Sequence, residues 1–163
     1  MDCRVKPGND ENERPGKARV EEKTMAYWLL KTEPDVFSWN DQVKRGAKGE
    51  PWTGVRNFTA RRYLKEMKKG EHALFYHTGE EKQVVGIAEV IRESYHDPTD
   101  EKGVFLAVDV KAVKPFPKPV TLASIKSEPR LKEMALAKYP RLSVQPVTAQ
   151  EWKIVCALGG VKD

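Results

Sequence analysis

Apolar and polar positions along the chain follow two periods, and the first clear pattern begins at Tyr27. The segment Tyr27–Thr32 is aromatic and apolar and stops before Pro34, which is typical of a strand. Further strands are predicted at 73–78, 83–94 and 104–113. In the last of these, apolar side chains recur at every second position, as expected for a strand with one buried face.

Apolar residues at helical spacing separate these strands. A short helix is predicted after the capping residue Ser38, with Trp39 and Val43 on its inner face. A second helix is predicted from its cap Asn57 to Lys69, where a glycine follows. Local capping signals and periodicity therefore place two helices between the first two predicted strands.

The chain beyond the strand at 104–113 contains prolines at alternate positions, and we predict that regular structure breaks at Pro115, Pro117 and Pro119. Ser127 is predicted to cap a short helix that contains Leu131, and 142–147 is predicted to be extended. Thr148 and Glu151 form the capping box of a last helix. Long central strands with short helices at both ends predict an α+β, mainly β fold, a small closed or nearly closed sheet with peripheral helices.

The first 24 residues differ from the rest of the chain. They contain no aromatic residue, and their six basic side chains are balanced by six acidic ones, so the net charge of +5 belongs to the remainder. Such a segment cannot bury enough apolar surface to offset its ordering entropy. We expect 1–24 to be a disordered tail, with a regulatory arm as the alternative, and 25–163 to form one domain.

Composition excludes several classes of protein. The net charge of +5 is compatible with a polyanionic partner but is mild. Two cysteines give no disulfide framework, and no apolar run approaches the ~18 residues of a membrane span, so we expect a cytoplasmic monomer without a membrane partner. Phosphate-binding loops and nucleophile elbows are absent, and the histidines lack metal-ligand spacing. We therefore expect no cofactor and no metal.

Four short clusters combine aromatic and polar residues: WLLKTE (28–33), WTGVRN (52–57), FYHT (75–78) and RLSVQP (141–146). Taken singly, each fits a strand end, a packed loop or a core aromatic equally well or better. Together they supply aromatic faces for stacking, amide groups for base edges and cations for phosphate. The set is typical of a pocket that holds an unstacked nucleobase.

These clusters resemble the EVE domain family, with YWLLKTEP (27–34), WTGVRN (52–57), LFYHT (74–78), VVGIAEV (84–90), DPT (97–99) and RLSVQPV (141–147) in order along the chain. The resemblance implies a PUA-like small β-barrel, related to YTH modules, with one pocket that recognises a modified base in DNA or RNA. Carried over by motif, the pocket residues are Trp28, Lys31, Thr32, Glu33, Trp52, Arg56, Asn57, Tyr76, His77, Ser143, Val144 and Gln145.

Two other functions stay open at the level of sequence. A small hydrolase acting on a modified nucleoside or RNA would use Lys31, Thr32 and Glu33, since a desolvated lysine beside a carboxylate can serve as a base. A protein-interaction module would keep the pocket without using it. We favour the non-enzymatic recognition module because no activated nucleophile is visible in the sequence.

Overall fold

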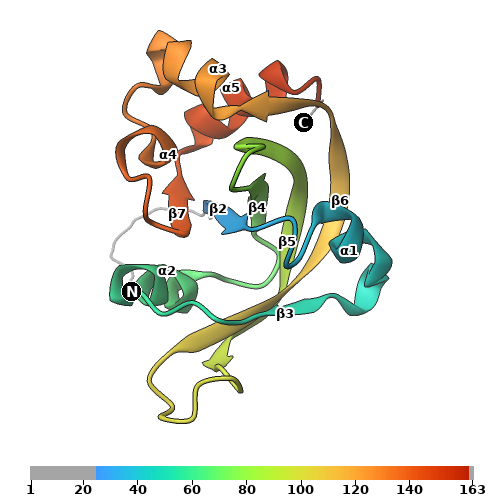
Figure 1. The fold of residues 1–163 in the computed structure, drawn as a ribbon, viewed down its shortest axis with the longest axis vertical. Helices are drawn as coiled ribbons and strands as arrows, with labels where there is room; N and C mark the ends of the chain where they lie inside the picture. The colour runs from blue at the N-terminus through green and yellow to red at the C-terminus, as the bar shows by residue number, and fades with distance from the viewer. Residues whose placement is uncertain (1–24, 162–163) are drawn as a thin grey trace, which may run out of the picture.

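The computed structural model describes residues 25–161, which form one mixed sheet flanked by short helices (Figure 1). The predicted tail, 1–24, lies outside the described residues. Six strands occur in the order β3-β6-β5-β4-β2-β7. Their bounds are β2 Tyr27–Thr32, β3 Glu50–Trp52, β4 His72–His77, β5 Gln83–His96, β6 Leu106–Thr121 and β7 Val144–Val147.

The sheet is open, so the expectation of a closed barrel is wrong, while the α+β, mainly β class is confirmed. Its two edge strands are short: β3 pairs with only three residues of β6, and β7 with four residues of β2. The edge strands β3 and β7 stand at opposite ends of the sheet order and are not paired with each other, so the sheet does not close into a barrel. At the centre, β2 and β4 run parallel, with Lys31 opposite Tyr76.

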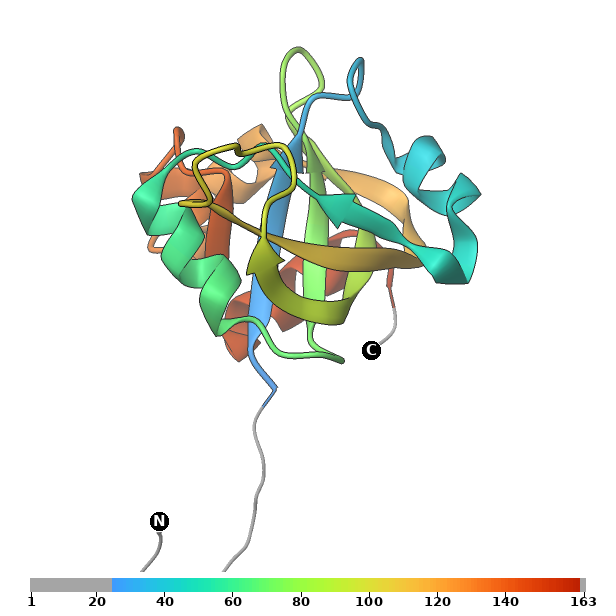
Figure 2. The ribbon, with the colours of Figure 1, turned by 90° about the horizontal axis from the view of Figure 1, so that it is seen from below.

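Helices cover both faces of the sheet. Their bounds are α1 Trp39–Lys44, η1 Gly46–Lys48, α2 Phe58–Glu66, α3 Leu122–Ser127, η2 Pro129–Leu131, α4 Ala135–Lys138 and α5 Ala149–Leu158. In Figure 2 the green helix α2 lies in front of the strands and the red helix α5 behind them. We call these sides the α2 face and the α5 face. No helix within 25–161 is both long and apolar enough to cross a membrane.

The central strands β2 and β4 are buried on both faces. Leu29 and Leu74 pack in the core of the α5 face, whereas Leu30 and Phe75 pack in the core of the α2 face. Because successive side chains of a strand point to opposite sides, the apolar run YWLL supplies both cores at once. The parallel pair is thus the frame from which side chains reach either face.

Helix capping largely follows the sequence. Ser38 with Asp41, and Thr148 with Glu151, form the expected capping boxes. The buried residues of α1, however, are Trp39 and Gln42, whereas Val43, which was expected on the inner face, is 50% exposed. The Gln42 side chain lies in the core because its Nε2 donates to the carbonyl of Val110 at 3.1 Å, an interaction that apolar periodicity does not detect.

Three predicted boundaries are wrong. Helix α2 ends at Glu66 rather than Lys69, because Met67 has extended dihedral angles. Ser127 is the last residue of α3, and Thr121 is its cap. Strand β6 continues through Pro115, Pro117 and Pro119. A proline is tolerated there because β6 beyond Val110 pairs with β5 on one side only, and the other side needs no backbone donors.

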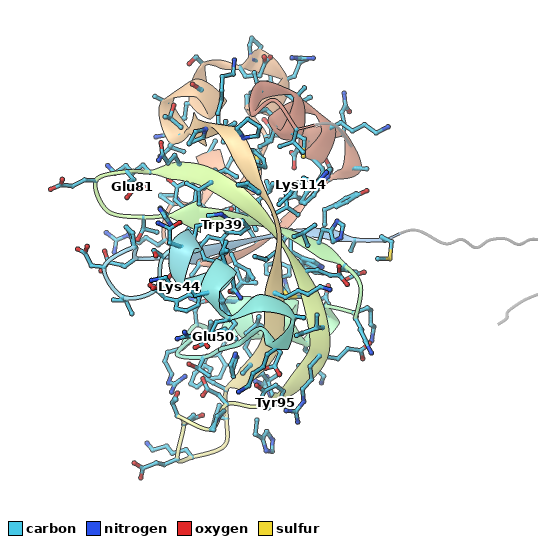
Figure 3. All side chains as sticks on the ribbon, turned by 90° about the vertical axis from the view of Figure 1, so that its right-hand side faces the viewer. Trp39, Lys44, Glu50, Glu81, Tyr95 and Lys114 are labelled. Atoms are coloured by element: carbon cyan, nitrogen blue, oxygen red, sulfur yellow. The ribbon has the colours of Figure 1, made fainter. Side chains whose placement is uncertain are left out.

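Gly86 permits close contact between β5 and α1. A Cβ atom at Gly86 would lie 2.6 Å from the indole of Trp39, which packs edge-on against Phe75 at 5.2 Å. Figure 3 shows Trp39 lying over the middle of the sheet. Because a buried ring cannot withdraw, we expect Gly86→Ala to lower the free energy of unfolding by about 1–3 kcal/mol. Urea denaturation measures this change, and a loss below about 0.5 kcal/mol would show that α1 can shift freely.

Candidate nucleic-acid interface

A cavity of about 550 Å³ lies between α2 and the segment that precedes β7. Its volume falls within the range of small-molecule sites. We call it the tyrosine pocket, and it is lined by Asn57, Thr59, Tyr63, Lys138, Tyr139, Pro140, Arg141 and Leu142. The lining thus combines two aromatic rings, one amide and two basic side chains.

Each wall of the tyrosine pocket is fixed by an amide side chain. Asn57 caps α2 through Oδ1, which accepts from the amide of Ala60 at 2.9 Å, and this leaves the Asn57 Nδ2 donor without a partner in 25–161. On the other wall, Gln145 Nε2 donates to the carbonyls of Tyr139 and Leu142 at 3.0 and 2.9 Å. Gln145 is fully buried, so it positions the wall.

Asp97 anchors the loop that leads to Asn57. Its Oδ2 accepts from the amide of Gly54 at 2.8 Å and from Arg56 Nη1 at 3.0 Å, while Oδ1 accepts twice from Thr99 at 2.7 Å. Burial acts to raise the pKa of Asp97, but these hydrogen bonds outweigh it and lower the pKa to about 2. The Asp97 carboxylate is therefore ionised, and it engages the guanidinium group of Arg56 in an ion pair.

A second cavity of about 260 Å³ lies on the α5 face. We call it the lysine pocket, and it is lined by Lys31, Tyr76, Thr78, Gly79, Lys82, Leu122, Lys126, Leu136 and Pro140. Lys31 Nζ donates to the carbonyl of Pro140 at 2.9 Å and lies 5.7 Å from the centre of the Tyr76 ring. Burial lowers the pKa of Lys31 and raises that of Tyr76. Pro140 borders both pockets.

Several of the residues expected at one pocket belong to the core of the α2 face. Trp28 is 3% exposed and Trp52 is 7% exposed. Val144 is enclosed in the same core, and His77 accepts from the amide of Trp39 at 3.0 Å through Nε2. In this arrangement Trp28, which lines none of the cavities described, offers no free face for stacking.

The remaining expected residues are divided between pockets. Thr32 and Trp52 border a third cavity of about 300 Å³. The carbonyl of Ser143 accepts from the amide of Lys31 at 3.0 Å, which fixes β2 against the segment before β7. Glu33 is exposed and forms no ion pair with Lys31, so the lysine–carboxylate pair expected of a hydrolase is not formed. Direct contact of the expected residues with a ligand stays a prediction.

Most residues of the tyrosine pocket were not predicted from the sequence. Tyr63 stands at helical spacing with the apolar residues of α2, yet it is only half-buried, and Tyr139 is 55% exposed. The omitted lining residues are Thr59, Tyr63, Lys138, Tyr139, Pro140, Arg141 and Leu142. One signal was available, because Arg141 opens the motif RLSVQPV. The pairing of α2 with this segment is a tertiary contact that no local pattern contains.

The mixed sheet with flanking helices also occurs in a solved domain of low sequence identity. The YTH domain of Zygosaccharomyces rouxii MRB1, solved in complex with N6-methyladenosine RNA, shares the fold with a TM-score of 0.54 at 19% identity, over 87% of this chain and 88% of that one. Residues 26–158 match the EVE domain, and the chain belongs to the EVE domain family.

The chain is similar in sequence to several proteins, and two of them have solved structures of similar fold. Rpa0253 from Rhodopseudomonas palustris is 60% identical, with a TM-score of 0.80, over 83% of this chain and 94% of that chain. The human THYN1 protein, in complex with DNA that contains 5-methylcytosine, is 30% identical, with a TM-score of 0.76, over 85% and 99%. Thymocyte nuclear protein 1 of Danio rerio is 35% identical over 83% of this chain and 72% of its own length.

Proposed function

We propose that this domain binds nucleic acid and recognises a modified base in the tyrosine pocket, without catalysis. The observation that carries the proposal is the lining of that pocket, where Tyr63 and Tyr139 lie beside the uncommitted amide of Asn57 and the guanidinium group of Arg141. The ammonium group of Lys138 also lines the pocket and is shared with Glu133 at 2.9 Å. These are the groups that hold an unstacked base: rings to stack on, a donor for its edge and cations for its phosphates. In this proposal the domain acts as a cytoplasmic monomer with no membrane partner.

The two relatives solved with nucleic acid support the proposal and supply the probes. Human THYN1 was solved with 5-methylcytosine DNA and the YTH domain with N6-methyladenosine RNA. Both modifications add one methyl group, and burying a methyl-sized group contributes about 0.8 kcal/mol. That corresponds to a roughly fourfold preference over the plain base. The methyl group therefore makes a small contribution to the affinity, and stacking and hydrogen bonds supply most of it.

Tyr139→Ala and Asn57→Ser test the pocket. Tyr139→Ala removes a stacking surface worth about 1–3 kcal/mol per base, so the Kd for a methylated oligonucleotide should rise about 5- to 150-fold. Asn57→Ser keeps a good helix cap and removes only the amide donor, so we expect the Kd to rise about 10-fold at unchanged stability. Fluorescence anisotropy with methylated and unmethylated DNA and RNA measures both effects.

Thermal unfolding of each variant is the control, since a change in melting temperature would indicate lost structure rather than a lost contact. If the wild-type protein binds methylated and plain oligonucleotides equally in every pair, it is not a modified-base reader. If both variants bind as tightly as the wild type, the base does not lie in the tyrosine pocket.

A further inference from the structure

The lysine pocket gathers cations that have no acidic partner. Of its three lysines, Lys82 and Lys126 form no ion pair within 25–161. By contrast, ion pairs engage Arg45, Arg56, Arg62, Arg130 and Lys138 elsewhere on the domain. The hydroxyl group of Tyr76 adds a hydrogen-bond donor to the same lining. Such a lining favours an anion with several acceptor oxygens.

The fold brings Lys82 and Lys126 together from distant parts of the chain. Lys82 has a φ of 45°, the only positive φ of a non-glycine residue in 25–161, and this left-handed conformation belongs to the tight β4–β5 turn. Its carbonyl accepts from the amide of Leu122 at 2.8 Å, which holds the β4–β5 turn against the start of α3. Both lysines consequently line the lysine pocket and the adjoining cavity of about 280 Å³.

Two carboxylates lie nearby and leave the pocket positive. Glu81, which Figure 3 shows in the β4–β5 turn, is engaged by His77 Nδ1 at 2.8 Å and by Gln83 Nε2 at 3.2 Å. Glu33 lies at the rim, with Oε1 3.5 Å from where a Cβ would stand on Gly79. The lining of the lysine pocket thus contains three lysines and no carboxylate.

The two pockets differ in size, and the smaller lysine pocket suits a phosphate group rather than a base. The lysine pocket, at about 260 Å³, is less than half the volume of the tyrosine pocket and below the usual range for small-molecule sites. Pro140 forms a shared wall, and Lys31 is fixed to its carbonyl. A strand that places a base in the tyrosine pocket would therefore reach the lysine pocket on passing Pro140.

We propose that the lysine pocket binds a phosphate of the nucleic-acid backbone next to the nucleotide whose base occupies the tyrosine pocket. This inference rests on the proposed function. Lys82 and Lys126 make the charge contacts, and Lys31, whose Nζ also donates to the carbonyl of Pro140, contributes its remaining donors to the lysine pocket. Contacts of this kind position the strand and carry no base preference.

The test measures how the binding constant for a methylated oligonucleotide depends on salt. In the full chain, Lys82→Gln combined with Lys126→Gln should reduce the slope of log K against log salt by about 0.7 to 0.9, the contribution of one phosphate contact. The ratio of Kd values for methylated and plain oligonucleotides should stay unchanged. Lys118→Gln combined with Lys153→Gln is the charge-matched control, because both lysines are exposed and line none of the cavities described.

The possible outcomes separate this inference from the proposed function. Equal slopes for the two double variants would overturn the phosphate site, while a preserved methyl preference in the wild type would leave base recognition standing. If the wild type binds no oligonucleotide, both proposals fail. Titration with inorganic phosphate, followed by the amide signals of Lys82 and Lys126, would then show whether the pocket serves a small phosphate-bearing ligand instead.

Discussion

Replacing Trp28 with alanine is expected to lower the free energy of unfolding by about 3–5 kcal/mol, the usual cost of emptying a buried tryptophan site. The indole is 3% exposed, and its Nε1 donates to Glu71 Oε1 at 2.9 Å. Glu71, itself 5% exposed, also accepts from the amides of Ala26 and Lys68 at 3.0 and 2.8 Å. The substitution therefore leaves a cavity and removes one donor from a buried carboxylate.

Urea denaturation of Trp28→Ala and Trp28→Phe measures this prediction. Trp28→Phe retains most of the ring volume but not the donor, so its loss of stability should be smaller than that of Trp28→Ala. Tyr139→Ala, at a site that is 55% exposed, should change stability by less than about 0.5 kcal/mol. If Trp28→Ala instead keeps the free energy of unfolding of the wild type and loses only nucleic-acid affinity, the indole contacts the ligand and does not stabilise the core.

Asp97→Ala is expected to lower the free energy of unfolding by about 2–4 kcal/mol, because it strands several donors that now bind a carboxylate. The side chain is fully enclosed and joins the loop of Gly54 and Arg56 to Thr99. The same change should weaken oligonucleotide binding, since that loop leads into the Asn57 cap. Asp97→Asn keeps the shape of the side chain and isolates the effect of charge.

The stabilisation from Asp97 should disappear in acid. Its pKa is lowered from 3.8 to about 2 in the folded protein, so folding favours the ionised form. A lowered pKa contributes stability that is complete above the unfolded value and is lost as the pH falls from about 4 to about 2. The stability difference between wild type and Asp97→Asn, measured by denaturation from pH 7 to pH 2, should narrow across that window. A difference that stays constant would assign the effect to packing.

Features controlled by neighbouring residues could be predicted from the sequence. The strand Tyr27–Thr32 and the capping boxes at Ser38 and Thr148 occur as expected, since each depends on a few adjacent residues. Strand β6 was missed at its prolines because the cost of a proline depends on whether a neighbouring strand needs its donor. That information lies in the sheet order, which no local pattern supplies.

The candidate site was harder to predict for a related reason. The family resemblance implied one pocket, but Thr32 and Lys31 are adjacent in a strand and therefore point to opposite faces of the sheet. Lys31 accordingly lines the lysine pocket and Thr32 the cavity beside Trp52. The tryptophans are buried because helices cover both faces of the sheet. This arrangement is known only from the assembled fold.

The parallel pair of β2 and β4 has a consequence for how this family can change over time. Side chains alternate between two filled cores, so inserting or deleting one residue within either strand would exchange every side chain beyond that point between the faces. Lys31 or Tyr76 would then leave the α5 face for the α2 face. We therefore expect these two strands to tolerate substitutions better than insertions or deletions.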